Sequence, residues 1–420
     1  MHHFEYKNNR LQAEGVDLAE LAADIGAPFY VYSEATLRRH INVFTTAFAG
    51  ADTLVAYSVK ANSNLAVLRV LASENAGADV VSIGEMMRAL KAGVPPEKIV
   101  FSGVGKTSDE MTAALQTGIY QFNVESAPEL ETLDGIGKRL GKPAPVAIRV
   151  NPDVAAGGHD KISTGRKEDK FGVSWEQTRA LYAIARDMNG VAVKGVDLHI
   201  GSQIADLAPF EAAFNKAAQL IADLRSDGCN IERLDLGGGL GIPYGTGAVP
   251  PHPDKYAELI KRVTAPLGVQ LIFEPGRMIA GNAGVMVTRV LFDKKGENRR
   301  FLVVDAAMND LIRPALYDAH HEILPVVRRE NAKETIYDVV GPVCESSDFF
   351  AKSRALPEFN AGDYLAVMSA GAYGAVQASQ YNTRPLIPEV LVNGDQYAVI
   401  RRRPSFDEMI ALEALPGWLA

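Results

Sequence analysis

The sequence is poor in cysteine, in long apolar runs and in positive charge, and each shortage excludes a class of protein. Two of its 420 residues are cysteines, Cys229 and Cys344, which are too few for a disulfide framework. No apolar stretch is long enough to cross a bilayer, and the chain does not begin as a secretory signal does. The net charge of -8 disfavours nucleic acid and acidic membranes as partners. We therefore expect a cytoplasmic protein with no nucleic-acid or membrane partner.

The composition that remains is typical of a globular protein. Hydrophobic residues make up 47% of the chain and charged residues 22%. A length of 420 residues predicts two or three domains, with a barrel as one large domain. Because the sequence has neither paired cysteines nor a His-Glu-x-x-His pattern, we predict no metal site.

Short apolar runs alternate with helix-like segments over residues 36–280. One such segment, 83–93, has apolar residues at helical spacing and ends on Gly93, where a left-handed cap is expected. Strands that alternate with helices pair in parallel, and eight of them close a (β/α)8 TIM-type barrel. A doubly wound open sheet is the competing fold, but no Gly-x-Gly-x-x-Gly follows the first strand. The predicted strands are 54–59, 78–82, 99–102, 120–124, 146–150, 193–200, 233–236 and 270–273.

A different pattern begins after about residue 280. Strand-like runs separated by turns follow one another with few helical connectors, which indicates an all-β domain. We predict that residues 281–420 form this domain and that residues 1–35 complete it, with 29–32 as an added strand. The predicted C-terminal strands are 285–292, 300–304, 335–340, 364–368 and 389–400.

Lys60 follows the first barrel strand and is the most informative residue of the chain. An amine at the mouth of a parallel barrel can form a Schiff base with an aldehyde such as that of pyridoxal phosphate. A solvated lysine at a strand end is the simpler interpretation of this segment alone. Further candidates at strand ends decide between the two.

Those candidates follow strands five to eight. Gly237, Gly238 and Gly239 follow strand seven, where barrels commonly bind phosphate, although a flexible turn would look the same. Glu274 follows strand eight; it is either an ordinary partner of Arg277 or a carboxylate that keeps a pyridine nitrogen protonated. His199 lies at the end of strand six, where it is either a core histidine or a flat ring beside a flat cofactor. Arg149 ends strand five near the same rim.

Together these segments resemble the alanine racemase-like, fold type III pyridoxal phosphate decarboxylases over nearly the whole chain. The resemblance implies that Lys60 is the Schiff-base lysine, that His199 stacks on the cofactor ring and that Glu274 pairs with its nitrogen. It also implies a set of cofactor-binding residues, which are Lys60, His199, Ser202, Gly238, Gly239, Glu274, Gly276, Arg277 and Tyr373. The motifs that carry it are 57–62, 199–203, 237–239 and 274–277.

Within this family the segments 309–317, 341–348 and 369–374, together with 159–165 and 170–172, resemble the diaminopimelate decarboxylases. These enzymes catalyse the last step of lysine biosynthesis, the conversion of meso-2,6-diaminopimelate to L-lysine and CO2. The resemblance implies a homodimer with shared active sites, in which Cys344 protonates the reacting carbon in the site of the opposite subunit. The implied substrate-binding residues are Arg277, Arg313, Tyr317, Glu345 and Tyr373.

The chemistry of this substrate agrees with these residue types. Diaminopimelate has an amino acid centre at each end, so the enzyme must bind the distal carboxylate and the distal ammonium. The guanidinium groups of Arg277 and Arg313 match a carboxylate bidentately, and Glu345 matches the ammonium. Taken one at a time, each could equally be a surface ion pair, and Cys344 could be an inert packing residue.

Three other functions remain in competition. A decarboxylase of the same fold could act on ornithine, arginine, carboxynorspermidine or a carrier-bound glutamyl group; Arg313 and Glu345 favour diaminopimelate. A racemase of this fold pairs the ring nitrogen with arginine, which Glu274 contradicts. A non-catalytic regulator can lose the Schiff-base or proton-donor residue, whereas Lys60 and Cys344 are both present.

Overall fold

The computed structural model describes residues 2–155, 164–165 and 168–419, which form two compact units. One unit comprises Leu37–Pro243 and Gly247–Ala280, and the other comprises Met1–Thr36, Tyr244–Thr246 and Gly281–Ala420. Among the described residues, none of the helices has the length and apolarity needed to span a membrane.

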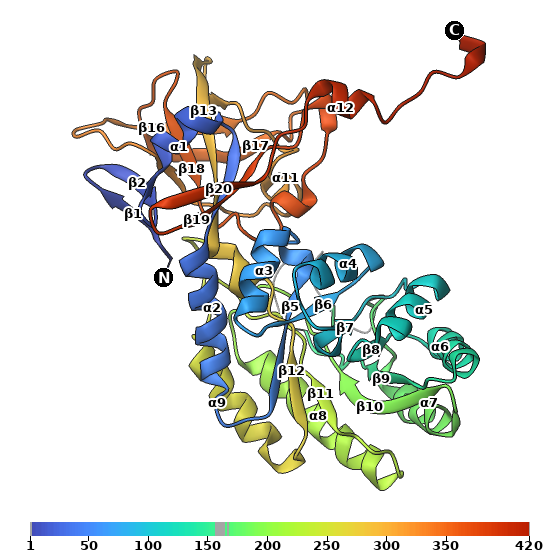
Figure 1. Cartoon of the computed structure of the whole chain (residues 1–420). Helices are drawn as coiled ribbons and strands as arrows, with labels where there is room; N and C mark the ends of the chain where they lie inside the picture. The colour runs from blue at the N-terminus through green and yellow to red at the C-terminus, as the bar shows by residue number, and fades with distance from the viewer. Residues whose placement is uncertain (1, 156–163, 166–167, 420) are drawn as a thin grey trace. The chain divides into compact units, whose positions relative to one another are not determined.

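The first unit is a closed barrel of eight parallel strands, which confirms the predicted fold class (Figure 1). Each strand pairs with the next along the chain, and the last pairs with the first through Ile272 and Leu54. The predicted strands agree with the observed ones to within a few residues because each is an apolar run that the barrel buries. The strands are β5 Thr53–Ser58, β6 Gly77–Val80, β7 Ile99–Phe101, β8 Gln121–Val124, β9 Ala144–Arg149, β10 Val191–Asp197, β11 Arg233–Asp235 and β12 Gln270–Phe273.

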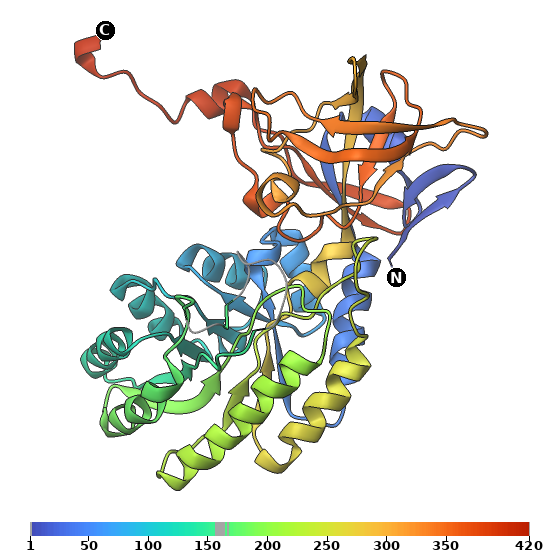
Figure 2. The same ribbon diagram turned by 180° about the vertical axis from the view of Figure 1, so that it is seen from behind.

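Helices surround this barrel, and α8 and α9 lie side by side on its outer surface (Figure 2). The predicted helix at 83–93 is α4; its N-cap Ser82 accepts a hydrogen bond from the backbone of Glu85. Gly93 lies just beyond its end with a φ of 93°, as a left-handed cap requires. The helices are α2 Glu34–Ala47, α3 Leu65–Ser73, α4 Ile83–Lys91, α5 Ser108–Thr117, α6 Ala127–Leu140, α7 Trp175–Asp187, α8 Ala208–Ser226 and α9 Pro253–Thr264.

The second unit is mainly β-structure, as predicted. A sheet of order β17-β16-β14-β13-β4-β19-β20 forms its frame, and β18 pairs with both β13 and β15. The N-terminal strand β4 lies between β13 and β19, so a segment near the start of the chain forms part of this sheet. The strands are β4 Phe29–Ser33, β13 Gly284–Lys295, β14 Arg300–Val304, β15 Ile323–Pro325, β16 Glu334–Val340, β17 Phe349–Pro357, β18 Tyr364–Val367, β19 Glu389–Asn393 and β20 Gln396–Arg401.

Several details of this unit differ from the prediction. The segment 389–400 is a hairpin of β19 and β20 and not one strand, because Gly394 turns the chain with a φ of 63°. Strand β17 was not predicted, although it is the edge strand that pairs with β16. A small meander of β1 Phe4–Lys7, β2 Arg10–Ala13 and β3 Val16–Asp17 was also missed.

Candidate active site

Lys60 lies at the C-terminal end of the first barrel strand, in a single 3₁₀ turn, Val59–Ala61, directly after β5. Its Nζ lies 2.7 Å from Oδ2 of Asp79, and the Asp79 side chain is completely buried. Ser58, the register partner of Asp79, donates a hydrogen bond of 2.8 Å to the same oxygen. The amine is thus held at the mouth of the barrel by an ion pair with a buried carboxylate.

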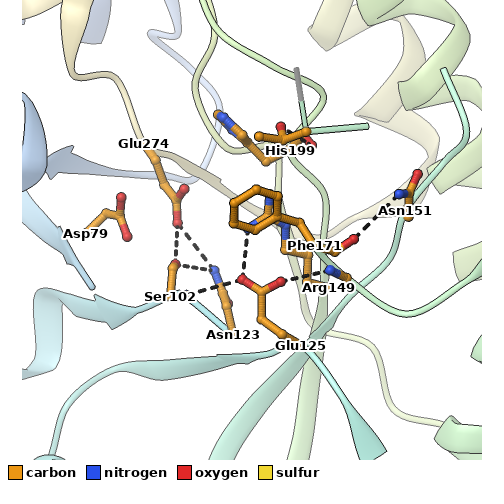
Figure 3. Close-up of polar contacts among 12 residues, drawn as sticks. Asp79, Ser102, Asn123, Glu125, Arg149, Asn151, Phe171, His199 and Glu274 are labelled. Carbon is orange, nitrogen blue, oxygen red and sulfur yellow. Dashed lines mark hydrogen bonds and ion pairs between the residues drawn. The ribbon is translucent and has the colours of Figure 1, made fainter. Parts of the chain in front are cut away.

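Glu274 follows β12 and is 6% exposed. Its Oε1 accepts hydrogen bonds from Ser102 Oγ at 3.1 Å and from Asn123 Nδ2 at 3.3 Å (Figure 3). Within the part of the chain that the structure describes, its Oε2 accepts no hydrogen bond. Burial first, and then the nearby carboxylates of Asp235 and Asp79, raise the pKa of Glu274 well above its usual value. A cation or an N–H donor beside Oε2 would stabilise the ionised carboxylate and so offset the cost of burying its charge.

Asn123 lies on β8 between two buried carboxylates. Its Nδ2 donates to Asp235 Oδ2 at 3.0 Å as well as to Glu274, and its Oδ1 accepts from Gln121 Nε2 at 2.8 Å. The bond from Gln121 fixes which end of the amide faces the acids. Since β8 and β11 are not neighbours, this contact crosses the barrel interior.

Asp235 lies at the end of β11 and is fully buried. Its Oδ1 accepts from the backbone N–H of Gly237 at 3.0 Å. Burial, reinforced by the carboxylate of Asp197, raises the pKa of Asp235 to about 8. Asp235 therefore keeps its proton to a higher pH than an ordinary aspartate does.

His199 follows β10 and is held by the glycine run after β11. The backbone N–H of Gly238 donates to His199 Nδ1 at 3.1 Å, so the ring hydrogen is on Nε2. Burial, with help from Arg149 and Lys60, lowers the pKa of His199 well below its usual value. The imidazole is therefore neutral as well as fixed in orientation.

The glycine run is required by close contacts. A Cβ at Gly238 would lie 2.4 Å from the carbonyl oxygen of Glu274, and one at Gly239 would lie 2.6 Å from that of Gly201. Gly239 also has a φ of 108°. The run therefore brings bare backbone to the barrel mouth, where N–H groups can approach an anion closely. Arg277, which begins the short helix α10 Arg277–Ala280, donates from Nη2 to Ser202 Oγ at 3.2 Å at the same end of the barrel.

Arg149 at the end of β9 forms a buried ion pair with Glu125, with 2.9 Å between Nη1 and Oε1 (Figure 3). The other oxygen of Glu125 accepts from the backbone of Gly172 at 2.8 Å. The guanidinium lies 4.8 Å from the centre of the Phe171 ring. This group therefore fixes the returning end of the loop after β9 to the barrel rim. The predicted motif at 159–165 lies outside the described residues except for its last two, 164 and 165.

The barrel unit thus gathers the predicted residues Lys60, His199, Ser202, Glu274 and Arg277 at the C-terminal ends of its strands. Sequence reasoning missed the polar residues that support them, and one signal could have found them. Each is a polar residue in or just after a buried strand, where an unpaired polar group would be costly. The missed residues are Asp79, Ser102, Asn123, Glu125 and Asp235.

The remaining predicted residues lie in the β unit. Arg313 begins α11 Arg313–Tyr317 and is buried, and Gln377 Nε2 donates to the hydroxyl of Tyr317 at 3.3 Å. Tyr373 has a φ of 56°, an uncommon value for a bulky residue. Cys344 is exposed, and its backbone N–H donates to Asn382 Oδ1 at 3.1 Å.

Glu345 is exposed beside Cys344. Hydrogen bonds from the hydroxyls of Ser347 and Tyr381 lower the pKa of Glu345. Its carboxylate therefore stays negative at neutral pH, as the binding of an ammonium group requires.

Comparison with known proteins gives a consistent set of relatives. Residues 34–281 match the family described as pyridoxal-dependent decarboxylase, pyridoxal binding domain. The diaminopimelate decarboxylase of Zymomonas mobilis is 48% identical, with 99% of each chain covered. The crystal structure of the Helicobacter pylori diaminopimelate decarboxylase complexed with L-lysine is 42% identical and has a TM-score of 0.91, covering 94% of this chain and 98% of that chain. The diaminopimelate decarboxylase of M. jannaschii in co-complex with L-lysine is 37% identical, with a TM-score of 0.95 and 100% of both chains covered.

Proposed function

The chain belongs to the pyridoxal-dependent decarboxylases, and from this premise we propose that it converts meso-2,6-diaminopimelate to L-lysine and carbon dioxide, the last step of lysine biosynthesis. The observation that carries the proposal is the full-length similarity to diaminopimelate decarboxylases, which extends over both compact units. The β unit matters most here, since it holds all of the residues expected to bind the distal end of the substrate except Arg277.

The barrel mouth fits pyridoxal 5′-phosphate. When bound, this cofactor supplies an electron sink for the electron pair that the departing carboxyl group leaves behind. Lys60 would hold its aldehyde, and Asp79 is the buried carboxylate that fixes the position of the Lys60 amine. Glu274 would accept the ring N–H at Oε2, because its Oε1 already receives hydrogen bonds from neutral donors. A neutral His199 would cover one face of the ring without repelling the protonated nitrogen.

The phosphate would bind where the chain offers N–H groups without Cβ atoms. Gly238 and Gly239 supply close backbone at this end of the barrel, and Arg277 with Ser202 supplies a cation and a hydroxyl. We assign Gly276, which directly precedes Arg277, to the same site. We assign Tyr373 of the β unit to the phosphate as well.

Substrate recognition then follows from charge. Arg277 and Arg313 bind the distal carboxylate, with Tyr317 and Tyr373 beside them, while Glu345 binds the distal ammonium. Remote binding of this kind orients the reacting centre, which lowers the entropic part of the barrier.

Cys344 Sγ donates the proton that completes the reaction. The bond between the α-carbon and its carboxyl carbon breaks, CO2 leaves, and a C–H bond forms in its place. We assign this thiol to the active site of the opposite subunit of a homodimer, and the exposed position of Cys344 supports that assignment. We propose the cytoplasm as the location of the enzyme.

The test is carbon dioxide release by the cofactor-loaded protein from meso-diaminopimelate, L-ornithine, L-arginine and carboxynorspermidine, each at several concentrations. We expect the highest kcat/KM for diaminopimelate. A higher value for any of the other three would refute the proposed substrate while leaving the decarboxylase class intact. Absence of activity on all four, in a protein that does not turn yellow with excess cofactor, would instead indicate a regulator.

A further inference from the structure

His321 is a completely buried histidine that the chemistry above does not use. It lies four residues after α11, just before β15, in the unit that carries the predicted substrate-binding side chains. Its Nδ1 lies 2.8 Å from the carbonyl oxygen of Met368, and its Nε2 lies 2.8 Å from Nη1 of Arg313. A histidine with both ring nitrogens bonded has a fixed plane.

These two partners determine where the ring hydrogen lies. A carbonyl oxygen can only accept, so His321 Nδ1 carries the hydrogen and donates it to Met368. A guanidinium can only donate, so Nε2 has no hydrogen and accepts from Arg313. His321 is therefore a neutral imidazole that serves as the acceptor for a buried cation.

Tyr244 completes the support of Arg313. Its ring centre lies 4.8 Å from the Arg313 guanidinium carbon, and it meets the His321 ring edge to face, at 5.4 Å and 82°. The guanidinium is thus packed against an aromatic face, and its Nη1 donates to His321. Both contacts restrict the orientation of the guanidinium plane. That orientation decides whether Arg313 can bind a carboxylate bidentately.

His321 also connects two segments that carry predicted substrate residues. Met368 directly follows β18 and begins the turn that leads to Tyr373. Ser369 and Tyr373 in this turn have φ values of 54° and 56°, so its backbone needs support from its surroundings. A single ring therefore holds both the turn before Tyr373 and the Arg313 side chain.

We propose that His321 is a positioning residue for substrate specificity: as a neutral acceptor it orients Arg313 to bind the distal carboxylate of diaminopimelate. This inference rests on the proposed function. In this role His321 does not itself bind the distal carboxylate, and it acts through the side chain of Arg313. Its contribution is made equally in the ground state and in the transition state, because the distal carboxylate does not react.

The experiment compares His321→Phe, which keeps a ring but removes both nitrogens, with His321→Gln, whose amide can still donate to Met368 and accept from Arg313. In the cofactor-loaded enzyme we expect His321→Phe to raise KM for diaminopimelate about tenfold or more, with kcat changed less than about threefold. His321→Gln should recover most of the loss. The matched control is His320→Phe, since the neighbouring His320 faces Arg354 at 3.0 Å and not Arg313.

A second readout separates positioning from a general role in folding. Binding of L-lysine and of cadaverine, which is lysine without its carboxyl group, is measured by calorimetry. His321→Phe should weaken L-lysine binding about tenfold and leave cadaverine binding unchanged. Equal weakening of both ligands, or an unchanged KM for diaminopimelate, would overturn the inference.

Two further outcomes are also decisive. If His321→Phe does not fold, Tyr244→Leu takes its place, because it removes the aromatic support of Arg313 from a half-buried position. The same selective loss of L-lysine binding is then expected, and its absence would count against the inference. A wild-type protein that does not decarboxylate diaminopimelate would refute the proposed function itself, whereas an active wild type with a normal His321→Phe variant would refute the inference alone.

Discussion

Asp79 lies 2.7 Å from the Lys60 amine, and its carboxylate is completely buried at the end of the neighbouring barrel strand. This contact is expected whether Lys60 forms a Schiff base or only neutralises the charge of Asp79. Substitution can separate the two, because an arginine can replace the charge but cannot react with an aldehyde.

We expect both Lys60→Ala and Lys60→Arg to abolish covalent cofactor binding. Each purified variant is incubated with pyridoxal phosphate, passed through a desalting column and examined for a visible absorbance band that borohydride bleaches. Lys91→Arg, on the exposed end of α4, should keep the band. A bleachable band in Lys60→Arg would remove Lys60 from its proposed role.

The raised pKa of Asp235 predicts how stability changes with pH. Because its pKa in the folded protein is about 8, against 3.8 in a model compound, the folded state binds this proton more tightly than the unfolded state. The resulting stabilisation is complete below about pH 4 and is lost as the pH rises through about 8. Asp235→Asn cannot ionise, so we expect it to become steadily more stable relative to the wild type between these pH values.

The measurement is the thermal midpoint of both proteins at several pH values from 5 to about 9, with the cofactor loaded. The substitution also removes one hydrogen-bond acceptor for Asn123. This loss shifts the thermal midpoint of the variant by an amount that does not depend on pH. Asp109→Asn, on the exposed first turn of α5, is the matched control. A constant difference between Asp235→Asn and the wild type would show that Asp235 is ionised in the folded protein.

The sequence predicted the site residues at the strand ends better than the buried polar residues that support them. Lys60, His199 and Glu274 could be found because each directly follows an apolar run, and the ends of parallel strands meet on one rim. Asn123 and Asp235 could not be connected, since they are 112 residues apart and meet only when the barrel closes. His321 was missed for the same reason, because its partner Met368 is 47 residues away.

Two strands of the β unit show a different limit. The segment 389–400 has an apolar run near each end, and the Asn393-Gly394 pair between them is a hairpin signal that the single-strand prediction missed. Gly394 has the positive φ that such a turn needs. Strand β17 contains Lys352, Ser353 and Arg354 in succession, a composition that is typical of a loop. Pairing with β16 on one side is enough to make it a strand despite this composition.

Glu345→Asp should weaken substrate binding more than it slows the reaction. The carboxylate would be withdrawn by one methylene from the distal ammonium, and losing a hydrogen bond to a charged group costs about 1.5–3 kcal/mol. We therefore expect KM for diaminopimelate to rise by about tenfold or more, with kcat within about threefold. The control is Glu334→Asp on the exposed part of β16. An unchanged KM would contradict the contact between Glu345 and the distal ammonium.

The assignment of Cys344 to the opposite subunit predicts how defective subunits complement one another. A Lys60→Ala subunit and a Cys344→Ser subunit, co-expressed with different affinity tags and purified as a heterodimer, should form one intact site of two and show about half of the wild-type activity. A heterodimer of wild type with the Lys60→Ala, Cys344→Ser double variant is the matched counterpart. If sites are shared, neither of its sites has both groups, and it should be nearly inactive. If each subunit uses its own Cys344, the second heterodimer has about half activity and the first almost none.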